Sequence, residues 1–118
     1  MKVTVIIPNY QGKDYIRACL DSLRGCRENG ETASAAEHAG EAFPARDAVY
    51  TVLVVDNGST DGSLEIIRQE YPEVQVIALP ENTGFCHAVN VGILAAETPY
   101  VLLLNNDTVI RPGFVEAL

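Results

Sequence analysis

The sequence predicts an α/β fold in which a parallel β-sheet carries helices on both faces. Two observations support this prediction. Short β-branched runs alternate along the chain with segments of helical period, and polar residues gather after three of the four predicted strands. This alternation is typical of right-handed βαβ units, whose crossover helices cover both faces of the sheet. The carboxyl ends of the strands would then form one ligand-binding edge.

The first part of the chain predicts one strand, one helix and an insertion. Val3–Ile7 is a β-branched run, and we expect it to end at Pro8 because proline cannot continue a central strand. Apolar residues in Asp14–Leu23 fall on one helical stripe, where Cys19 serves as a small apolar residue. The segment Gly25–Asp47 is polar and lacks a lasting period, so it predicts a surface insertion.

Three further strands and two helices complete the predicted fold. The strands are Tyr50–Val55, Val74–Leu79 and Tyr100–Leu104. The helix after Tyr50–Val55 would start at a cap formed by Thr60 or Asp61, and Pro72 would end it. The last helix, Phe85–Ala96, would turn five residues inward: Phe85, Ala88, Val89, Gly92 and Ala96.

Composition excludes several classes of protein. The chain has 118 residues, which is one domain's worth, and a net charge of −8. An acidic protein gains no general electrostatic attraction to nucleic acid or anionic lipid, so a phosphate ligand would need a local device such as a metal ion. No apolar run approaches the twenty residues of a membrane helix. Three cysteines without CxxC spacing argue against disulfides or zinc and favour a reducing cytosol.

Two segments that follow predicted strands carry polar groups suited to a ligand. Asp56 ends a buried strand, where a carboxylate accepts hydrogen bonds from a base N–H or a sugar hydroxyl. Asp107 follows an apolar strand and two amides, a setting that suits a hard divalent cation gripping a diphosphate. Each segment alone is also typical of an ordinary turn with a cap or an Asx motif.

A third segment is Asn82-Thr-Gly-Phe, with Asn90 and Gly92 downstream on the predicted helix. Its glycine permits the positive φ of a turn. Gly92 would let the helix approach its neighbour closely. His87, within the same stretch, is more typical of a solvated side chain than of a ligand.

Together these segments resemble the family 2 glycosyltransferases, which have the Rossmann-like GT-A nucleotide-diphospho-sugar transferase fold. The resemblance rests on Val-Ile-Ile-Pro-Asn-Tyr, on Val-Val-Asp-Asn-Gly-Ser-Thr-Asp-Gly, on Asn-Thr-Gly-Phe and on Leu-Asn-Asn-Asp. It runs over Val3–Leu118 and is interrupted by the insertion at 25–47. The Asn-Thr-Gly-Phe and Asn-Asn-Asp versions look most like the rhamnosyltransferase-like branch.

The resemblance implies that residues 1–118 are the N-terminal nucleotide-sugar-binding part of a glycosyltransferase domain, truncated after the metal motif. It implies a nucleotide-diphospho-sugar donor, a glycan or lipid-linked acceptor, and inverting transfer of a hexosyl or rhamnosyl group. A role in cell-wall or polysaccharide biosynthesis follows, in the cytoplasm or at the inner face of the membrane through partners. No nucleic acid partner is expected.

The resemblance also implies roles for individual residues. Asp107 would bind Mg²⁺ or Mn²⁺ that bridges the donor diphosphate and offsets charge on the leaving group. Asp56 would contact the nucleobase, in a pocket shaped by Asn57 and Ser59. The residues expected to bind the nucleotide-sugar are Pro8, Tyr10, Asp56, Asn57, Ser59, Asn82, Gly84, Asn90, Asn105 and Asn106.

The chain departs from the family pattern in three places. Asn105 takes the first acidic position of the DxD motif, which lowers the negative charge around the metal. Asn57 replaces an aspartate that is frequent in the family. The family's catalytic base is an acid beyond the metal motif, so we expect it beyond Leu118. The chain alone would then bind a donor with little or no transfer.

Other functions remain as alternatives. A catalytically inactive module that binds nucleotide or forms a homo-oligomer through an exposed sheet edge is the main one. A phospho-acceptor signalling domain needs acids after the first strand and a lysine after a late one, whereas the only lysines are Lys2 and Lys13. Classical dinucleotide binding lacks its GxGxxG signature after the first strand.

Overall fold

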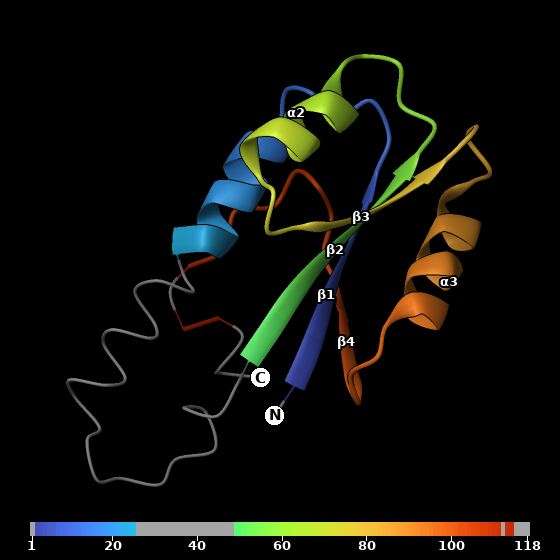
Figure 1. Cartoon of the computed structure of the whole chain (residues 1–118). Helices are drawn as coiled ribbons and strands as arrows, with labels where there is room; N and C mark the ends of the chain where they lie inside the picture. The colour runs from blue at the N-terminus through green and yellow to red at the C-terminus, as the bar shows by residue number, and fades with distance from the viewer. Residues whose placement is uncertain (1, 26–48, 112, 115–118) are drawn as a thin grey trace, which may run out of the picture.

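A computed structural model describes residues 2–25, 49–111 and 113–114 of the chain. Four strands form one parallel sheet in the order β3-β2-β1-β4. Their bounds are β1 Lys2–Asn9, β2 Val49–Asn57, β3 Gln75–Leu79 and β4 Tyr100–Leu103. The helices comprise residues 16–25, α2 at Ser63–Glu70 and α3 at Phe85–Ala95. The predicted parallel α/β fold is confirmed (Figure 1).

The helices divide into two layers, one on each face of the sheet (Figure 1). On one face the helix of residues 16–25 and α2 bury the larger apolar cluster, which includes Val5, Ile16 and Ile67. On the other face α3 covers a smaller cluster around Ile6 and Val55. Successive side chains of β1 therefore point into two apolar clusters, one on each face of the sheet. This explains why the sequence of β1 is apolar without a break.

Strand β1 continues through Pro8 to Asn9, so the prediction that it ends at Pro8 is wrong. Pairing of β1 with β4 stops at Ile6, whose carbonyl accepts the N–H of Leu104 at 2.9 Å. Backbone groups two residues apart face the same neighbouring strand. Pro8 therefore turns its nitrogen, which has no proton, toward the side where β4 has already ended. Pairing with β2 continues on the other side to Asn9 and Asp56.

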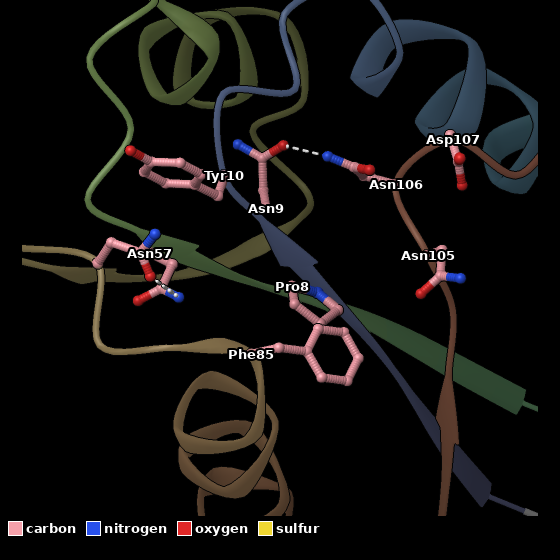
Figure 2. A pocket seen from close by; sticks show the side chains of 9 residues that line it. Pro8, Asn9, Tyr10, Asn57, Phe85, Asn105, Asn106 and Asp107 are labelled. Atoms are coloured by element: carbon pink, nitrogen blue, oxygen red, sulfur yellow. Dashed lines mark hydrogen bonds between the residues drawn. The ribbon is translucent and has the colours of Figure 1, made fainter.

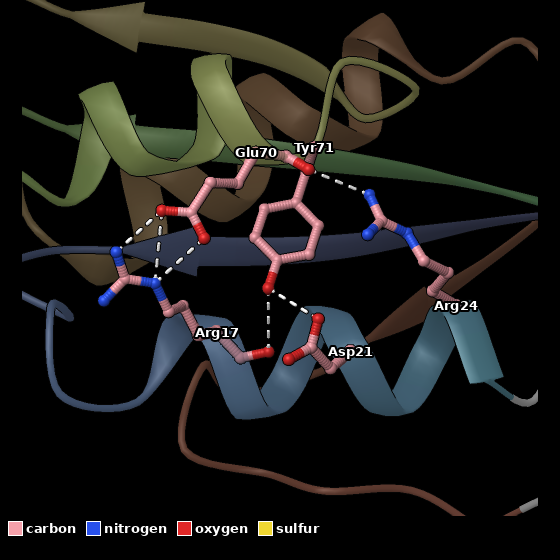
Figure 3. Close-up of polar contacts among 5 residues, drawn as sticks. All are labelled: Arg17, Asp21, Arg24, Glu70 and Tyr71. Carbon is pink, nitrogen blue, oxygen red and sulfur yellow. Dashed lines mark hydrogen bonds and ion pairs between the residues drawn. The ribbon is translucent and has the colours of Figure 1, made fainter.

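Polar contacts fasten the helix of residues 16–25 to α2 (Figure 3). Arg17 pairs with Glu70 at 2.6 Å, and Arg24 lies 4.6 Å from the centroid of the Tyr71 ring. The Tyr71 hydroxyl donates to Asp21 at 2.7 Å. Burial and this acidic partner raise the pKa of Tyr71. Exposed ion pairs each add little stability, but together with the buried Tyr71 ring they fix how the two helices lie.

Cys19 lies in this layer and is fully buried, as predicted. Burial raises the pKa of its thiol to about 11. The side chain therefore behaves as a small apolar group in the core rather than as a nucleophile.

Helix α3 packs closely against the sheet, as its glycine predicts. A Cβ on Gly92 would lie 2.7 Å from Ile6 Cγ2 and 3.2 Å from Val55 Cγ2. Ala88 is also buried, whereas Phe85 is 54% exposed, so the prediction that Phe85 faces inward is wrong. Phe85 is the first residue of α3, at the end where the helix meets the ligand-binding edge, and its ring turns toward that edge instead.

Helix α2 begins after Gly62 rather than after the predicted caps Thr60 or Asp61. Gly62 has φ 91°, a left-handed conformation that glycine adopts without steric cost. The Asp61 carboxylate still accepts the N–H of Ser63 at 3.0 Å and so satisfies one free donor of the helix.

Some predictions fall outside the described residues. The insertion predicted at 25–47 lies there except for Gly25, as does most of the segment after Arg111. Within the described ranges, no helix has the length and apolar character needed to cross a membrane.

Candidate functional site

A cavity of about 370 Å³ opens at the carboxyl ends of β1, β2 and β4 (Figure 2). This is the edge at which parallel sheets bind ligands, and the sequence predicts its polar residues there. The first helical turn of α3 and the loop after β3 close one side. The lining residues are Pro8, Asn9, Tyr10, Asn57, Asn82, Phe85, Asn105, Asn106 and Asp107.

Asp56 lies at the end of β2 and is 1% exposed, immediately behind the pocket wall. One carboxylate oxygen accepts the Asn9 side-chain N–H at 2.9 Å, and the other accepts the backbone N–H of Ser59 at 3.0 Å. Both oxygens are thus held by neutral donors, so this buried acid has partners although it has no cation beside it among the described residues.

Asn57 holds one wall of the pocket together. Its amide nitrogen donates to Asn82 Oδ1 at 3.0 Å and to the Gly84 carbonyl at 3.1 Å. Its oxygen accepts the backbone N–H of Thr83 at 2.9 Å. An aspartate could not donate to the two oxygens, so asparagine is the residue that this wall requires.

The loop after β1 and the turn after β2 are joined by a second set of hydrogen bonds. Gln11, with φ 52°, donates its backbone N–H to the Ser59 hydroxyl at 3.0 Å. Lys13 donates its backbone N–H to Asp61 at 3.0 Å. Burial alone would raise the pKa of Asp61, but the hydrogen bonds from Ser63 and Lys13 outweigh it and lower the pKa. Ser59 and Asp61 therefore shape the site without lining the pocket.

The β4 end of the pocket has fewer contacts. The Asn106 amide donates to Asn9 Oδ1 at 2.9 Å. Asn105 and Asp107 are exposed, and their side chains form no hydrogen bond with the described part of the chain. No cluster of three or more histidine, cysteine or acidic side chains occurs among the residues the structure describes.

Two exposed aromatic rings border the pocket (Figure 2). Tyr10 is 49% exposed and Phe85 is 54% exposed. Exposed rings beside a polar floor are suited to packing against a planar or sugar ring while amides read its polar edge. The family resemblance implied that Tyr10 borders the nucleotide pocket, and sequence reasoning missed Phe85.

The predicted residues do not all meet at the cavity. Seven of them line it, namely Pro8, Tyr10, Asn57, Asn82, Asn105, Asn106 and Asp107. Asp56, Ser59 and Gly84 support the lining through hydrogen bonds: the first two accept from Asn9, and the third accepts from Asn57. Asn90 is exposed on α3 and lies outside the lining.

Asn9 is the second lining residue, besides Phe85, that sequence reasoning missed. It is fully buried, and its side chain contacts residues from β2, from the start of α2 and from the loop after β4. Its sequence signal was its place in the Pro-Asn-Tyr stretch directly after the predicted first strand, whereas its pairing opposite Asp56 appears only in the structure.

Known proteins share both the sequence pattern and the fold. The family model described as "Glycosyl transferase family 2" matches residues 4–118. The poly(ribitol-phosphate) beta-glucosyltransferase of Bacillus spizizenii is 33% identical over 114 residues, covering 93% of this chain and 15% of its own length. The N-acetylglucosaminyl-diphospho-decaprenol L-rhamnosyltransferase of Mycobacterium tuberculosis is 33% identical over 85 residues, covering 63% of this chain and 28% of its own length.

A solved structure of a related protein has a similar fold. The crystal structure of S. aureus TarS 1-349 in complex with UDP-GlcNAc matches with a TM-score of 0.64 at 30% identity, over 91% of this chain and 27% of that one. The chain therefore spans less than a third of the length of these relatives. The predicted GT-A fold is confirmed, and because the family model covers almost every residue, this chain belongs to glycosyl transferase family 2.

Proposed function

We propose that this chain carries the donor-binding half of an inverting glycosyltransferase, and that the pocket between β2 and β4 holds a nucleotide-diphospho-sugar. The observation that supports this most is the placement of seven of the predicted donor-binding and metal residues around one cavity. They come from segments far apart in the sequence, and the fold brings them to the ligand-binding edge of the sheet.

In this proposal the two ends of the pocket take different parts of the nucleotide. Asp56, buried behind the wall, accepts a hydrogen bond from the nucleobase, while Tyr10 and Phe85 pack against its rings. The diphosphate lies toward Asn105 and Asp107. A UDP-sugar is the donor we test first, because the relative TarS was solved with UDP-GlcNAc.

The residues at the β4 end fit a divalent cation shared with the donor. The Asp107 carboxylate and the Asn105 amide oxygen are hard donors of the type that Mg²⁺ and Mn²⁺ prefer. Mg²⁺ is commonly held by one or two carboxylates together with substrate phosphates, so two protein ligands are enough. When bound, the cation would offset the charge of the leaving nucleoside diphosphate. The general base would be an acid outside these 118 residues.

Calorimetric titration tests the proposal. The 118-residue chain is titrated with UDP, GDP and dTDP in the presence of Mn²⁺, and we expect heat with one of them. Asp107→Ala should lower the affinity because it removes the only carboxylate that lines the pocket among the described residues. The matched control is Asp14→Ala, an exposed carboxylate outside the lining, which should bind as the wild type does. No heat with any of the three nucleotides would contradict the proposal.

A second candidate is a self-associating module without transfer activity. Strand β4 is an edge of the described sheet, and Tyr100, Val101 and Leu103 are exposed on it. Unpaired edges with apolar side chains favour association between chains. Light scattering that rises with protein concentration and does not respond to UDP would support this candidate over donor binding.

A further inference from the structure

Asn9 connects the two ends of the pocket through one carboxamide group. It ends β1, lies opposite Asp56 in the strand register and is fully buried. Its nitrogen donates to Asp56 at 2.9 Å and to the Ser63 hydroxyl at 3.0 Å. Its oxygen accepts the side-chain N–H of Asn106 at 2.9 Å, across 97 positions of sequence (Figure 2).

The direction of these hydrogen bonds is fixed from the Asp56 side. A carboxylate oxygen accepts, so Asn9 must present its NH₂ to Asp56. The Asn9 oxygen then faces the β4 loop, and the residue there must be a donor. Asn106 meets this demand with its own NH₂, whereas an acid at the same position would place one acceptor against another. Asp56 thus sets the orientation of the Asn9 amide, and that orientation requires a hydrogen-bond donor at position 106.

Gly12 provides independent support for this arrangement because it packs directly over the link. A Cβ on Gly12 would lie 2.1 Å from Asn9 Oδ1 and 2.2 Å from Asn106 Nδ2, the two atoms that share the hydrogen bond. Gly12 does not have the left-handed φ that favours glycine. The need for glycine here therefore comes from the link below it.

We propose that Asn9 is a positioning residue of the donor site, which holds the nucleobase carboxylate Asp56 and the metal-motif amide Asn106 at a fixed separation. The proposal rests on the proposed function. With this spacing fixed, a nucleoside diphosphate engages both ends of the pocket at once. A nucleoside without phosphates uses the Asp56 end alone. Breaking the link should therefore weaken the contribution of the diphosphate and leave nucleoside binding intact.

The test compares two alanine substitutions of glycine. Gly12→Ala pushes a methyl group into the link, while Gly25→Ala is the control because no heavy atom lies within 4 Å of its added Cβ. Affinities for uridine and for UDP are measured by following backbone amide signals in NMR titrations with Mg²⁺ present, because this cation does not broaden the signals. We expect the UDP-to-uridine affinity ratio to fall about tenfold in Gly12→Ala, the size of coupling found within one hydrogen-bond network. Gly25→Ala should keep the wild-type ratio.

Asn106→Ala is the second variant, which keeps the test decisive if Gly12→Ala does not fold. This substitution removes the Asn106 amide, a half-buried group with one side-chain hydrogen bond, and with it the bond to Asn9. The UDP-to-uridine affinity ratio should fall as it does in Gly12→Ala. Where both fold, the double variant should lose no more than Asn106→Ala alone, since both changes break the same bond.

The outcomes separate this inference from the proposed function. A wild type that binds neither UDP nor uridine overturns both. A wild type that binds UDP more tightly than uridine, with the same ratio in Gly12→Ala and Asn106→Ala, overturns the positioning role and leaves the donor site standing. Losses that multiply in the double variant also overturn it, because the two substitutions would then act separately.

Discussion

The two ends of the pocket are built differently. At the β2 end, Asp56 and Asn57 are buried, and the polar atoms of their side chains have partners within the chain. At the β4 end, Asn105 and Asp107 are exposed, and within the described part of the chain only the Asn106 side chain is hydrogen-bonded to the rest of the site. The β2 end is therefore organised by the fold alone.

This difference indicates how a ligand would be recognised. Preformed hydrogen-bonding groups lose little entropy on binding and can discriminate between bases, so they suit a nucleobase. Exposed oxygen ligands suit a phosphate and a hydrated cation, which bring charge and coordination of their own. The Asn9–Asn106 hydrogen bond joins the rigid end to the open one.

Removing a carboxylate at each end should give the largest contrast. Asp56→Ala leaves the Ser59 N–H without its acceptor and leaves the buried Asn9 amide with serine hydroxyls as its acceptors, so we expect a loss of about 3 kcal/mol in the free energy of unfolding. Asp107→Ala removes an exposed side chain and should change stability by less than about 0.5 kcal/mol. Urea denaturation followed by circular dichroism measures both. Equal losses would show that the two ends do not differ.

A pair of glycines with similar φ compares the packing at the β2 end with a position outside the pocket lining. Gly58 has φ +80° and Gly113 has φ +84°, so alanine is strained equally at both. A Cβ on Gly58 would also lie 2.6 Å from the backbone carbon of Glu81, whereas none lies within 4 Å at Gly113. We expect Gly58→Ala to cost about 2 kcal/mol or more and Gly113→Ala about 1 kcal/mol. Thermal unfolding of the two variants would decide the comparison, and a greater cost at Gly113 would speak against it.

Adding an acid at neighbouring positions of the metal motif should have opposite results. Asn106→Asp places a carboxylate against Asn9 Oδ1, and we expect it to lower stability by about 1 kcal/mol and to weaken UDP binding. Asn105→Asp adds the same charge at an exposed side chain, so stability should hold and Mn²⁺-dependent UDP binding should strengthen. The same calorimetric titration compares them. Tighter binding by Asn106→Asp would refute the fixed direction of the hydrogen bonds.

The smallest expected effect is a pH dependence at the β2 end. The pKa of Asp61 is lowered by its hydrogen bonds, so its folded-state value lies below the 3.8 of the free side chain. Its contribution to stability is therefore fully present above that pH and is lost as the pH falls through the folded value. The difference in unfolding free energy between wild type and Asp61→Ala should stay constant near neutral pH and shrink below about 3.8. A difference that grows in acid would contradict this assignment.

Much of the fold could be predicted from the sequence because its apolar residues follow clear strand and helix patterns. The β-branched runs around Val5 and Val54 and the helical stripe around Ile16 leave few other arrangements. The misplaced details depend on neighbours that local patterns do not show. Pro8 remains in its strand because β4 ends early beside it, and Phe85 is exposed because it stands at the rim of the pocket.

The candidate site was predictable only in part. Motif resemblance marks Asp56 and Asp107, which lie at or shortly beyond the carboxyl ends of their strands. It does not show that Asn9 joins Asp56 to Asn106, because this role depends on strand register and on an amide 97 positions away. The space above that hydrogen bond, which requires Gly12 to lack a side chain, appears only in three dimensions.

The central claim is that one nucleoside diphosphate spans both ends of this pocket. Paramagnetic broadening by Mn²⁺ tests it most directly on the isotope-labelled chain in the presence of UDP. We predict that Mn²⁺ added with UDP broadens the backbone amide signals of residues 105–108. In a second sample, with Mg²⁺ in place of Mn²⁺, UDP should shift the amide signals of Asn57 and Asn82. The claim would be contradicted if Mn²⁺ broadened only amide signals near acidic residues elsewhere in the chain. It would also be contradicted if UDP did not shift the amide signals of Asn57 and Asn82.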